Sequence, residues 1–554
     1  MLILIFRGDI IKKQTNLQLF HEAHMKMQNS MPTQYVKMLK REFKGYSGKT
    51  FLSDAIAGIT VGAVALPLAL AFGASSVPLE YATIGITAGL ITAILAGIIT
   101  GLLGGAGFQI SGPTGTMTVI LFGLIGGKYG FTGLFAAIFL AGIIRLLAGI
   151  FHLGKLIKFI PKPVVTGFTA GIALIIALGQ TGNFFGVTLN GATTIDKLSY
   201  FFANELSNIS LPTVLCSLGV IFLMVFYPKK IAKYIPGSLG ALIVGTIVVT
   251  VFSIDVSIIK DTGEIPRSLM NTKLLNFSDL NLQMLIDVIG PAFSIAMLCM
   301  IETLLCGTCA AKMKKEEFNP NIELVAQGVA NLVIPFFGGV PSTAALARTS
   351  VAIRAGGKTR IAGVFHSLFL LACMFVLSGA ISLVPFSALA GVLIVTAYRM
   401  NDWGQIKCYF GGKMWGAIAQ FLTTMIVTVL VDLTYAVVCG IVLAFVLYLI
   451  NMAKLGKKRK KLSVTKELAN GNALVSISGV CFFANSDKLF GTAIGLDEAS
   501  TVEIDLGGLV YADYTACETL SEVYSDLKET GKSVSFTNSP ENTTKTLKHI
   551  GVEI

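Results

Sequence analysis

Two short segments, far apart in the chain, each place Ser and Thr residues directly after a Gly/Pro break and ahead of a run of helix formers. They are Phe108-Gln-Ile-Ser-Gly-Pro-Thr-Gly-Thr-Met117 and Gly338-Gly-Val-Pro-Ser-Thr-Ala-Ala-Leu-Ala-Arg348. A helix that begins at such a break presents free backbone N–H groups and the positive end of its dipole, and both favour an anion. We therefore predict an anion site between two helix N-termini; a pair of ordinary interhelical turns is the alternative. The predicted binding positions are Thr114, Gly115, Thr116, Ser342, Thr343, Ala344, Ala347 and Arg348.

Two ionisable residues in apolar stretches bear on this site. Glu302 is the lone carboxylate deep in the stretch 288–311, where an acid is costly and usually functional. Because burial disfavours the charged carboxylate, a proton bound there would couple transport to the proton gradient. The alternative is a permanently protonated Glu302 that is hydrogen-bonded to a neighbouring helix. Arg348 is expected about two turns into its helix, as the only fixed positive charge near the site. It acts either through its electrostatic potential or as a hydrogen-bond partner for backbone carbonyls.

The composition indicates a membrane protein. The chain has 554 residues, of which 54% are hydrophobic and 13% charged, and its mean hydropathy is +0.75. These values are too apolar for a soluble protein of this size. The net charge of +12 comes from Lys and Arg clusters between apolar stretches, which indicate topology rather than a surface for nucleic acid. We find no metal-ligand spacing, nucleotide-binding loop or Ser/His/Asp arrangement, so we expect no metal, no cofactor and no enzyme activity.

Fourteen apolar stretches are candidate membrane spans, although the third, ninth, tenth and twelfth are shorter than the roughly 20 residues that cross a bilayer. Basic clusters precede the first span and follow the even-numbered ones, so both termini are predicted to be cytoplasmic. The loops around 183–209 and 255–286 then lie outside. The spans are 54–73, 81–103, 113–126, 131–150, 163–181, 210–227, 235–254, 288–311, 322–337, 342–354, 360–380, 384–398, 415–431 and 433–451.

The spans also fall into two matching halves. The offset from Asp54 to Asp287, at the openings of the first and eighth spans, nearly equals the offset from Pro113 to Pro341. Because seven is odd, the second copy of a seven-span repeat must be inverted. The predicted fold is thus an α-helical polytopic membrane protein with a seven-plus-seven inverted repeat.

Segments outside the spans complete the predicted organisation. Residues 1–48 form a cytoplasmic extension, poorly ordered over 7–35, and residues 49–455 form the transport domain. Beyond a basic run suited to an anionic membrane surface, residues 462–554 form a small cytosolic α/β domain. Its predicted strands are 473–478, 501–506 and 532–536, and its predicted helix is 514–529.

Several motifs in the same order resemble those of the SulP anion transporters. They are Asp54-Ala-Ile-Ala-Gly58 with Ala65-Leu-Pro67, Gln109-Ile-Ser-Gly-Pro-Thr-Gly115, Ile301-Glu-Thr-Leu-Leu305 with Glu323-Leu-Val-Ala-Gln-Gly328, and Gly338-Gly-Val-Pro341 through Ala347-Arg-Thr349. The resemblance covers roughly residues 37–554, and the tail resembles a STAS domain. Anti-sigma STAS domains carry Asp-Ser-Ser-Gly where this chain has Asp513-Tyr-Thr-Ala516, so phosphorylation of a matching Ser is not available.

The resemblance implies a secondary active transporter in the cytoplasmic membrane for sulfate, bicarbonate, chloride or a dicarboxylate. It implies a core domain of spans 1–4 and 8–11, a gate domain of spans 5–7 and 12–14, a homodimer and an elevator-like movement. It also implies that Phe72 lines the anion pocket and that Glu302 binds a coupling proton or sodium ion. An uncoupled anion channel or exchanger remains an alternative. A nucleobase–cation symporter is disfavoured, because resemblance to that group would require a carboxylate where Arg348 stands.

Overall fold

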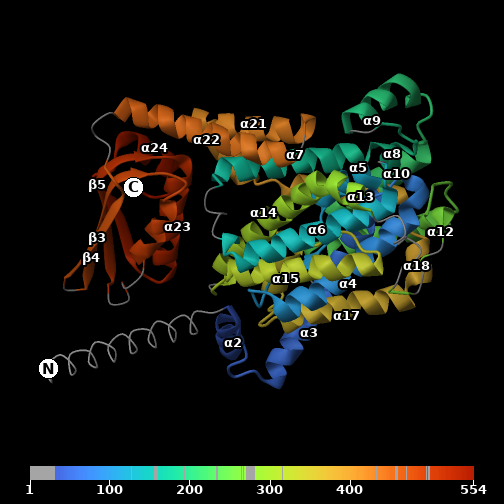
Figure 1. Ribbon diagram of the computed structural model, residues 1–554, viewed down its shortest axis with the longest axis horizontal. Helices are drawn as coiled ribbons and strands as arrows, with labels where there is room; N and C mark the ends of the chain where they lie inside the picture. The colour runs from blue at the N-terminus through green and yellow to red at the C-terminus, as the bar shows by residue number, and fades with distance from the viewer. Residues whose placement is uncertain are drawn as a thin grey trace, which may run out of the picture.

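A helical body with a small β/α domain at one end makes up the computed structural model (Figure 1). The C-terminal domain lies at the left of that view, and α8, α9, α12 and α18 lie at the opposite end of the body. Residues 1–30 and most of the basic run 457–461 lie outside the described residues, together with the predictions made for them. The structure describes residues 31–554 except 126–127, 155–159, 192–193, 233–234, 264, 266–267, 270–280, 315, 432, 456–459, 470, 494–495 and 497–498.

A helix occupies the position of each of the fourteen predicted spans. Six helical segments of the described chain are long and apolar enough to cross a membrane, and five more are apolar but shorter, so the count of fourteen crossings stays a prediction. The helices at the predicted spans are α3 (Gly48–Ser75), α4 (Ala82–Leu103), α5 (Gly115–Ile125), α6 (Gly130–Ile150), α7 (Lys162–Gly179), α10 (Leu211–Val225), α12 (Gly237–Val251), α14 (Ile289–Lys314), α15 (Pro320–Val333), α16 (Leu346–Arg354), α17 (Ile361–Val376), α19 (Phe386–Met400), α21 (Trp415–Leu430) and α22 (Leu433–Leu455). Shorter helical segments between them are η1 (Leu79–Tyr81), α8 (Thr181–Phe185), α9 (Thr194–Tyr200), η3 (Phe201–Glu205), α11 (Lys229–Ala232), η4 (Ile259–Thr262), α13 (Leu282–Asp287), η7 (Ile334–Phe337), α18 (Ser378–Ser382) and α20 (Trp403–Gly411).

The two Gly/Pro-broken segments meet inside the helical body as a pair of two-residue strands. Strand β1 (Ser111–Gly112) runs antiparallel to β2 (Thr343–Ala344), and both strands are buried. Non-helical backbone in such surroundings has no water to bond, so it must find partners within the protein. The pairing joins the two segments directly, and it is the structural reason why both helices, α5 and α16, start at the same place.

Helices α6 and α15 pack with their backbones nearly in contact. A Cβ atom added to Gly328 of α15 would lie only 2.6 Å from the backbone nitrogen of Leu146 on α6, so no larger residue fits there. Small residues let helices approach in this way inside a membrane. The close approach places Arg145, on the same part of α6, against α15 and the segment that ends in β2.

The C-terminal domain is a four-stranded sheet in the order β3-β4-β5-β6, with β3 antiparallel and the other pairs parallel. Its elements are β3 (Ser463–Ala469), β4 (Asn472–Cys481), η9 (Ser486–Ala493), β5 (Thr501–Ala512), α23 (Tyr514–Glu529), β6 (Ser533–Thr537) and α24 (Glu541–His549). The predicted helix and all three predicted strands are confirmed, whereas β3 and α24 had not been predicted.

The C-terminal domain touches the helical body through α23. The Lys162 ammonium at the start of α7 lies 3.2 Å from the Glu518 carboxylate, which also accepts a hydrogen bond from Gln405 of α20. The rings of Tyr514 and Tyr409 meet edge to face, with centroids 4.8 Å apart. The contact surface therefore belongs to α7, at a predicted gate span, and to α20, which lies between the two gate spans at α19 and α21.

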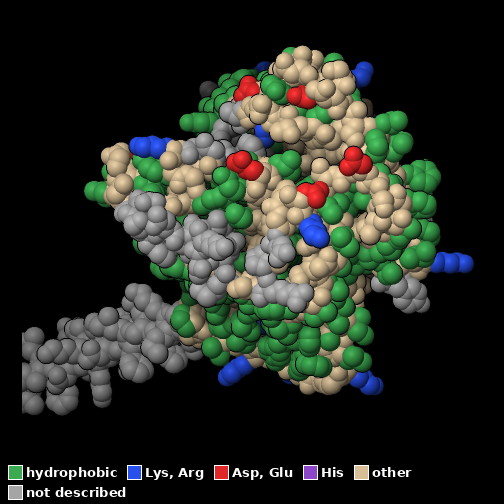
Figure 2. Space-filling view, turned by 90° about the vertical axis from the view of Figure 1, so that its right-hand side faces the viewer, with side chains coloured by type: hydrophobic (Ala, Val, Ile, Leu, Met, Phe, Trp, Pro, Cys, Tyr) green, Lys and Arg blue, Asp and Glu red, His purple; other side chains and the backbone are tan. Residues whose placement is uncertain are grey.

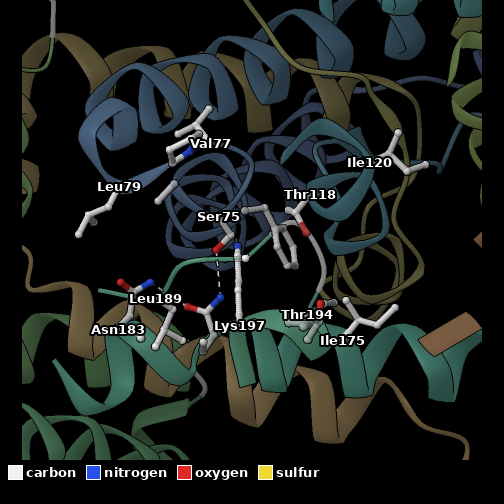
Figure 3. A pocket seen from close by; sticks show the side chains of 18 of the residues that line it. Ser75, Val77, Leu79, Thr118, Ile120, Ile175, Asn183, Leu189, Thr194 and Lys197 are labelled. Carbon is white, nitrogen blue, oxygen red and sulfur yellow. Dashed lines mark hydrogen bonds between the residues drawn. The ribbon is translucent and has the colours of Figure 1, made fainter. Parts of the chain in front are cut away.

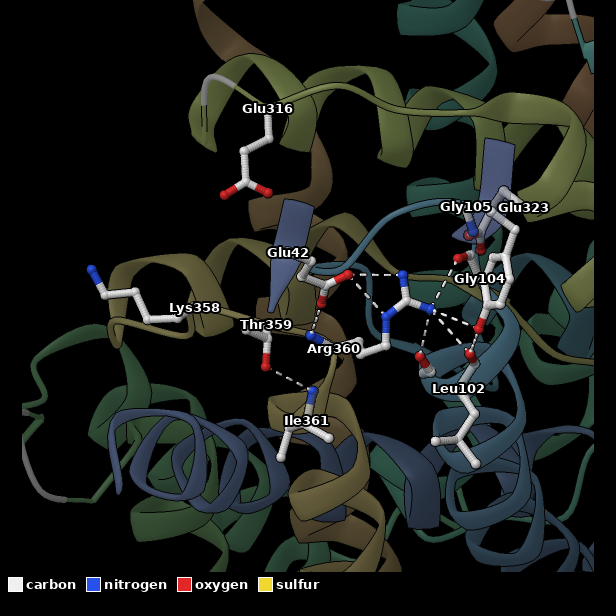
Figure 4. Close-up of polar contacts among 12 residues, drawn as sticks. Glu42, Leu102, Gly104, Gly105, Glu316, Glu323, Lys358, Thr359, Arg360 and Ile361 are labelled. Atoms are coloured by element: carbon white, nitrogen blue, oxygen red, sulfur yellow. Dashed lines mark hydrogen bonds and ion pairs between the residues drawn. The ribbon is translucent and has the colours of Figure 1, made fainter. Parts of the chain in front are cut away.

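An N-terminal helix, α2 (Met31–Glu42), lies against the helical body, so the prediction of poor order is wrong for residues 31–35. Its Glu42 carboxylate pairs with Arg360, whose Nε and Nη2 atoms both lie 2.9 Å from Oε2, and both side chains are almost fully buried (Figure 4). Arg360 also donates to the Leu102 and Gly104 carbonyls at the end of α4. The pair thus ties α2 to the adjoining ends of α4 and α17.

We predict that Glu42→Ala destabilises the protein by about 3–5 kcal/mol, because it leaves the Arg360 charge buried without its partner. Arg41→Ala on the same helix is the matched control, since its pair with Glu317 is exposed and worth little. Thermal unfolding of the detergent-solubilised protein measures both variants. Equal melting temperatures for the two would show that the buried pair does not stabilise the fold.

Candidate functional site

The predicted coupling acid lies in direct contact with the predicted anion ligands. The Thr116 hydroxyl donates to Glu302 Oε1 at 2.5 Å, and the Thr114 hydroxyl donates to Oε2 at 3.0 Å. Helix α14 supplies Glu302, while the two threonines flank the first residue of α5. Since the two hydroxyl oxygens are only 2.7 Å apart, one carboxylate bridges both.

The first turn of α5 has free donors next to an aromatic ring. Among the described contacts, the N–H groups of Gly115 and Thr116 have no protein partner, whereas that of Met117 bonds the Thr114 carbonyl. A Cβ atom on Gly115 would lie 2.2 Å from Ile176 Cδ1 and 2.9 Å from the Phe72 ring, so a larger residue there would displace these side chains. Phe72, predicted from the family resemblance, therefore lies at the start of α5.

The second segment is arranged differently from the prediction. Ser342, Thr343 and Ala344 were expected in the first helical turn, but Thr343 and Ala344 form β2 and α16 begins at Leu346. The Ser342 N–H donates to Asn331 at 2.9 Å, and all three residues are buried. These residues hold the segment in place and offer no free first-turn N–H groups. That expectation was wrong because pairing with β1 extends the backbone there.

The first turn of α16 contains Ala347, an exposed residue, and Arg348, which is buried. Arg348 thus lies in the first turn, rather than two turns into the helix. Its Nη2 atom donates to the Pro113 carbonyl at 2.9 Å, whereas Nε and Nη1 have no partner among the described residues. The guanidinium therefore donates to one backbone carbonyl and also places a positive charge close to the start of α5.

Arg145 is a second buried cation that the sequence prediction missed. Its guanidinium, on α6, is fully buried and donates to the Ser342 carbonyl at 2.8 Å, and to Thr303 and Gln327 at 3.2 Å each. Arg348 is therefore not the only fixed positive charge near the site. A lone arginine in the apolar span 131–150 was a visible signal, by the same rule that selected Glu302.

A cavity of about 1600 Å³ is lined in part by residues of α8 and α9, which lie at the end of the body away from the C-terminal domain in Figure 1. Phe72 is the one predicted site residue among the lining, and Thr118, in the second turn of α5, also lines it. Figure 3 shows this cavity with side chains from several helices around it. Phe72 accordingly borders both the cavity and the start of α5, which makes it the boundary between open space and the buried polar cluster.

Comparison with known proteins places these features in context. Residues 51–427 match the family described as the Sulfate permease family. The chain is 34% identical over 502 residues to the putative sulfate transporter YvdB of Bacillus subtilis (strain 168), which covers 88% of this chain and 91% of that protein. The transmembrane domain of a cyanobacterium bicarbonate transporter, BicA, is 31% identical with a TM-score of 0.63, covering 71% of this chain and 98% of that one. The structure of SLC26A9, at 17% identity, shares the fold with a TM-score of 0.63 over 91% of this chain and 87% of that one.

We predict that Thr114→Trp abolishes anion binding, because the indole fills the space at the start of α5. Arg348→Met, which keeps the side-chain volume, should weaken binding only about tenfold through the loss of one partly screened charge. Calorimetric titration of the purified protein with sulfate and with bicarbonate measures both effects. Thr250→Trp on an exposed face of α12 is the control for a bulky substitution.

Undiminished binding by the Thr114 variant would place the anion elsewhere. Complete loss of binding in a folded Arg348 variant would make the arginine a direct ligand.

Proposed function

The chain belongs to the sulfate permease family, and from this premise we propose that it is a secondary active transporter of small anions in the cytoplasmic membrane. The substrate class is sulfate, bicarbonate or a dicarboxylate, carried together with a proton or a sodium ion. Relatives named as sulfate and bicarbonate transporters support this class of substrate.

The observation that carries the proposal is the contact between Glu302 and the two threonines at the start of α5. A charged carboxylate at that place repels an anion bound to the adjoining N–H groups. A proton or a sodium ion that neutralises Glu302 removes the repulsion, so the anion and the co-ion each favour binding of the other. This sign of coupling is that of symport.

The anion in this proposal is bound by the free N–H groups at the start of α5, with Phe72 beside it. The first turn of α16 supplies further N–H groups, around Ala347, and the Arg348 charge adds attraction at short range. Ser342, Thr343 and Ala344 act indirectly, by fixing the position at which α16 starts. The site thus uses helix dipoles and backbone donors.

We also propose the domain arrangement: an extension over 1–48, a transport domain over 49–455 and a STAS domain over 462–554, in a homodimer with both termini cytoplasmic. Polar contacts within each predicted unit support an elevator-like movement of core against gate. In the core, Arg145 links α6, α14 and α15. In the gate, Ser217 of α10 donates to the Ser387 carbonyl of α19 at 3.1 Å. Each unit therefore has internal contacts that allow it to move as a body.

Reconstitution tests the proposal. Proteoliposomes with imposed proton or sodium gradients, offered sulfate, bicarbonate and dicarboxylates in turn, should accumulate at least one of these anions above its equilibrium level. We predict that Glu302→Gln still binds that anion but no longer accumulates it, because the amide cannot gain or lose the coupling charge.

The control for Glu302→Gln is Glu80→Gln, which removes a carboxylate from the cavity lining without touching α5. If the Glu302 variant concentrates its substrate with an unchanged dependence on both gradients, Glu302 has only a structural role.

A further inference from the structure

Lys197 is a cationic side chain in the cavity, well apart from the residues assigned to the anion site. It lies on α9, a helix outside the predicted spans, and the cavity is also lined by Ser75, Gln180 and Asn183. Figure 3 shows the Lys197 side chain entering the cavity on the side where Ser75 lies. Among the described lining residues, Lys197 is the only Lys or Arg.

Neutral donors surround the place that Lys197 enters. Gln180 donates to the Ser75 hydroxyl at 3.1 Å, and Asn183 donates to the Gln180 carbonyl oxygen at 3.3 Å. Ser75 accepts in this chain, so its own O–H can be donated elsewhere, and each amide group has a second N–H. An ammonium group with several neutral donors is a suitable environment for a small oxyanion or carboxylate.

The position of this cluster connects it to the proposed transport site. Ser75 and Phe72 are three residues apart on α3, a spacing that puts them on one face of the helix, and both line the cavity. An anion held at Ser75 is therefore one helical turn from the aromatic ring at the start of α5.

We propose that Lys197, Ser75, Gln180 and Asn183 form an outer capture site, which binds the same class of small anions before they pass Phe72. The proposal rests on anion transport by this chain, but it concerns a second site. The site concentrates the substrate at the outer mouth and sets the affinity for external anion, while the maximal rate is set at α5 and Glu302.

The acidic side chains around the cavity explain why an anion needs a cation there in order to enter. Acidic side chains gather around the middle of the end face seen in Figure 2. Among the lining residues that the structure describes, the other ionisable groups are Glu80 of η1, Asp261 of η4 and Tyr435 of α22, and Asp196 precedes Lys197 on α9. Because the carboxylates repel anions, Lys197 supplies the attraction that makes entry favourable.

The protonation of Lys197 makes this capture dependent on pH. Burial lowers the pKa of Lys197 to about 8, so the side chain is mostly charged at neutral pH. A lowered lysine pKa means that the charged form is complete well below pH 8 and is lost as the pH rises through that value. The affinity for external anion should therefore fall between about pH 7 and pH 9.

Uptake kinetics test the proposal. We predict that Lys197→Met raises the KM for external sulfate or bicarbonate several-fold, leaves the maximal rate within about twofold and removes the part of the rise of KM from pH 7 to 9 that comes from deprotonation of Lys197. Lys197→Arg should restore the KM at pH 7 and give the same reduced pH dependence as the Met variant, since arginine stays charged. An unchanged KM and pH profile in the Met variant would overturn the proposal.

A binding measurement separates this site from the transport site. Sulfate or bicarbonate should protect Lys197 of the purified protein from an amine-acetylating reagent, as measured by mass spectrometry, with exposed Lys548 as the reference. Protection should persist in Thr114→Trp, whose transport site is blocked. No protection of Lys197 would overturn the capture site even if transport is intact, whereas protection without uptake in any gradient would instead overturn the proposed function.

Discussion

Backbone that leaves the helical conformation inside a membrane must have every polar group satisfied, and this constraint governs the centre of the molecule. The two broken segments meet it by pairing with each other as β1 and β2. The Pro113 carbonyl, directly after β1, accepts a hydrogen bond from the buried Arg348. The Ser342 carbonyl, directly before β2, accepts one from the buried Arg145. Because both carbonyls are hydrogen-bonded, the N–H groups in the first turn of α5 remain as free donors. Their partial positive charge suits an anion.

The same arrangement brings the Glu302 carboxylate into hydrogen bonds with Thr114 and Thr116, beside the proposed anion position. In the proposed mechanism, two buried cations and two helix dipoles attract an anion while the carboxylate opposes it, so the balance depends on whether Glu302 carries a charge. A transporter that binds its substrate only with a co-ion needs such a balance. The free energy of anion binding must be close to zero without the co-ion and favourable with it. In the proposed pathway, the cavity beyond Phe72 decides how readily an anion reaches this point from outside.

Local signals made much of the fold predictable. Long apolar stretches between basic clusters located every helix at the predicted spans, and three of the four strands of the C-terminal domain were equally plain, whereas β3 was missed. The errors involve contacts between distant residues. The extended backbone at Thr343 depends on a partner more than 200 residues away, and α2 is held by a pair between Glu42 and Arg360. Neither contact leaves a periodic pattern in the sequence. Arg145 differs, because the sequence shows it as an isolated charge in an apolar span. Only its hydrogen-bond partner, the Ser342 carbonyl, could not be read from the sequence.

The central claim is that Glu302 and the anion site are thermodynamically linked through their shared threonines. The most direct measurement is the number of protons or sodium ions taken up per anion bound, obtained by calorimetry of the purified protein. Titrations in buffers of different ionisation heat report protons, and a sodium series reports sodium. The account predicts uptake of one co-ion with each anion by the native protein and none by Glu302→Gln. Anion binding that takes up no co-ion in the native protein, or the same uptake in both proteins, would contradict it.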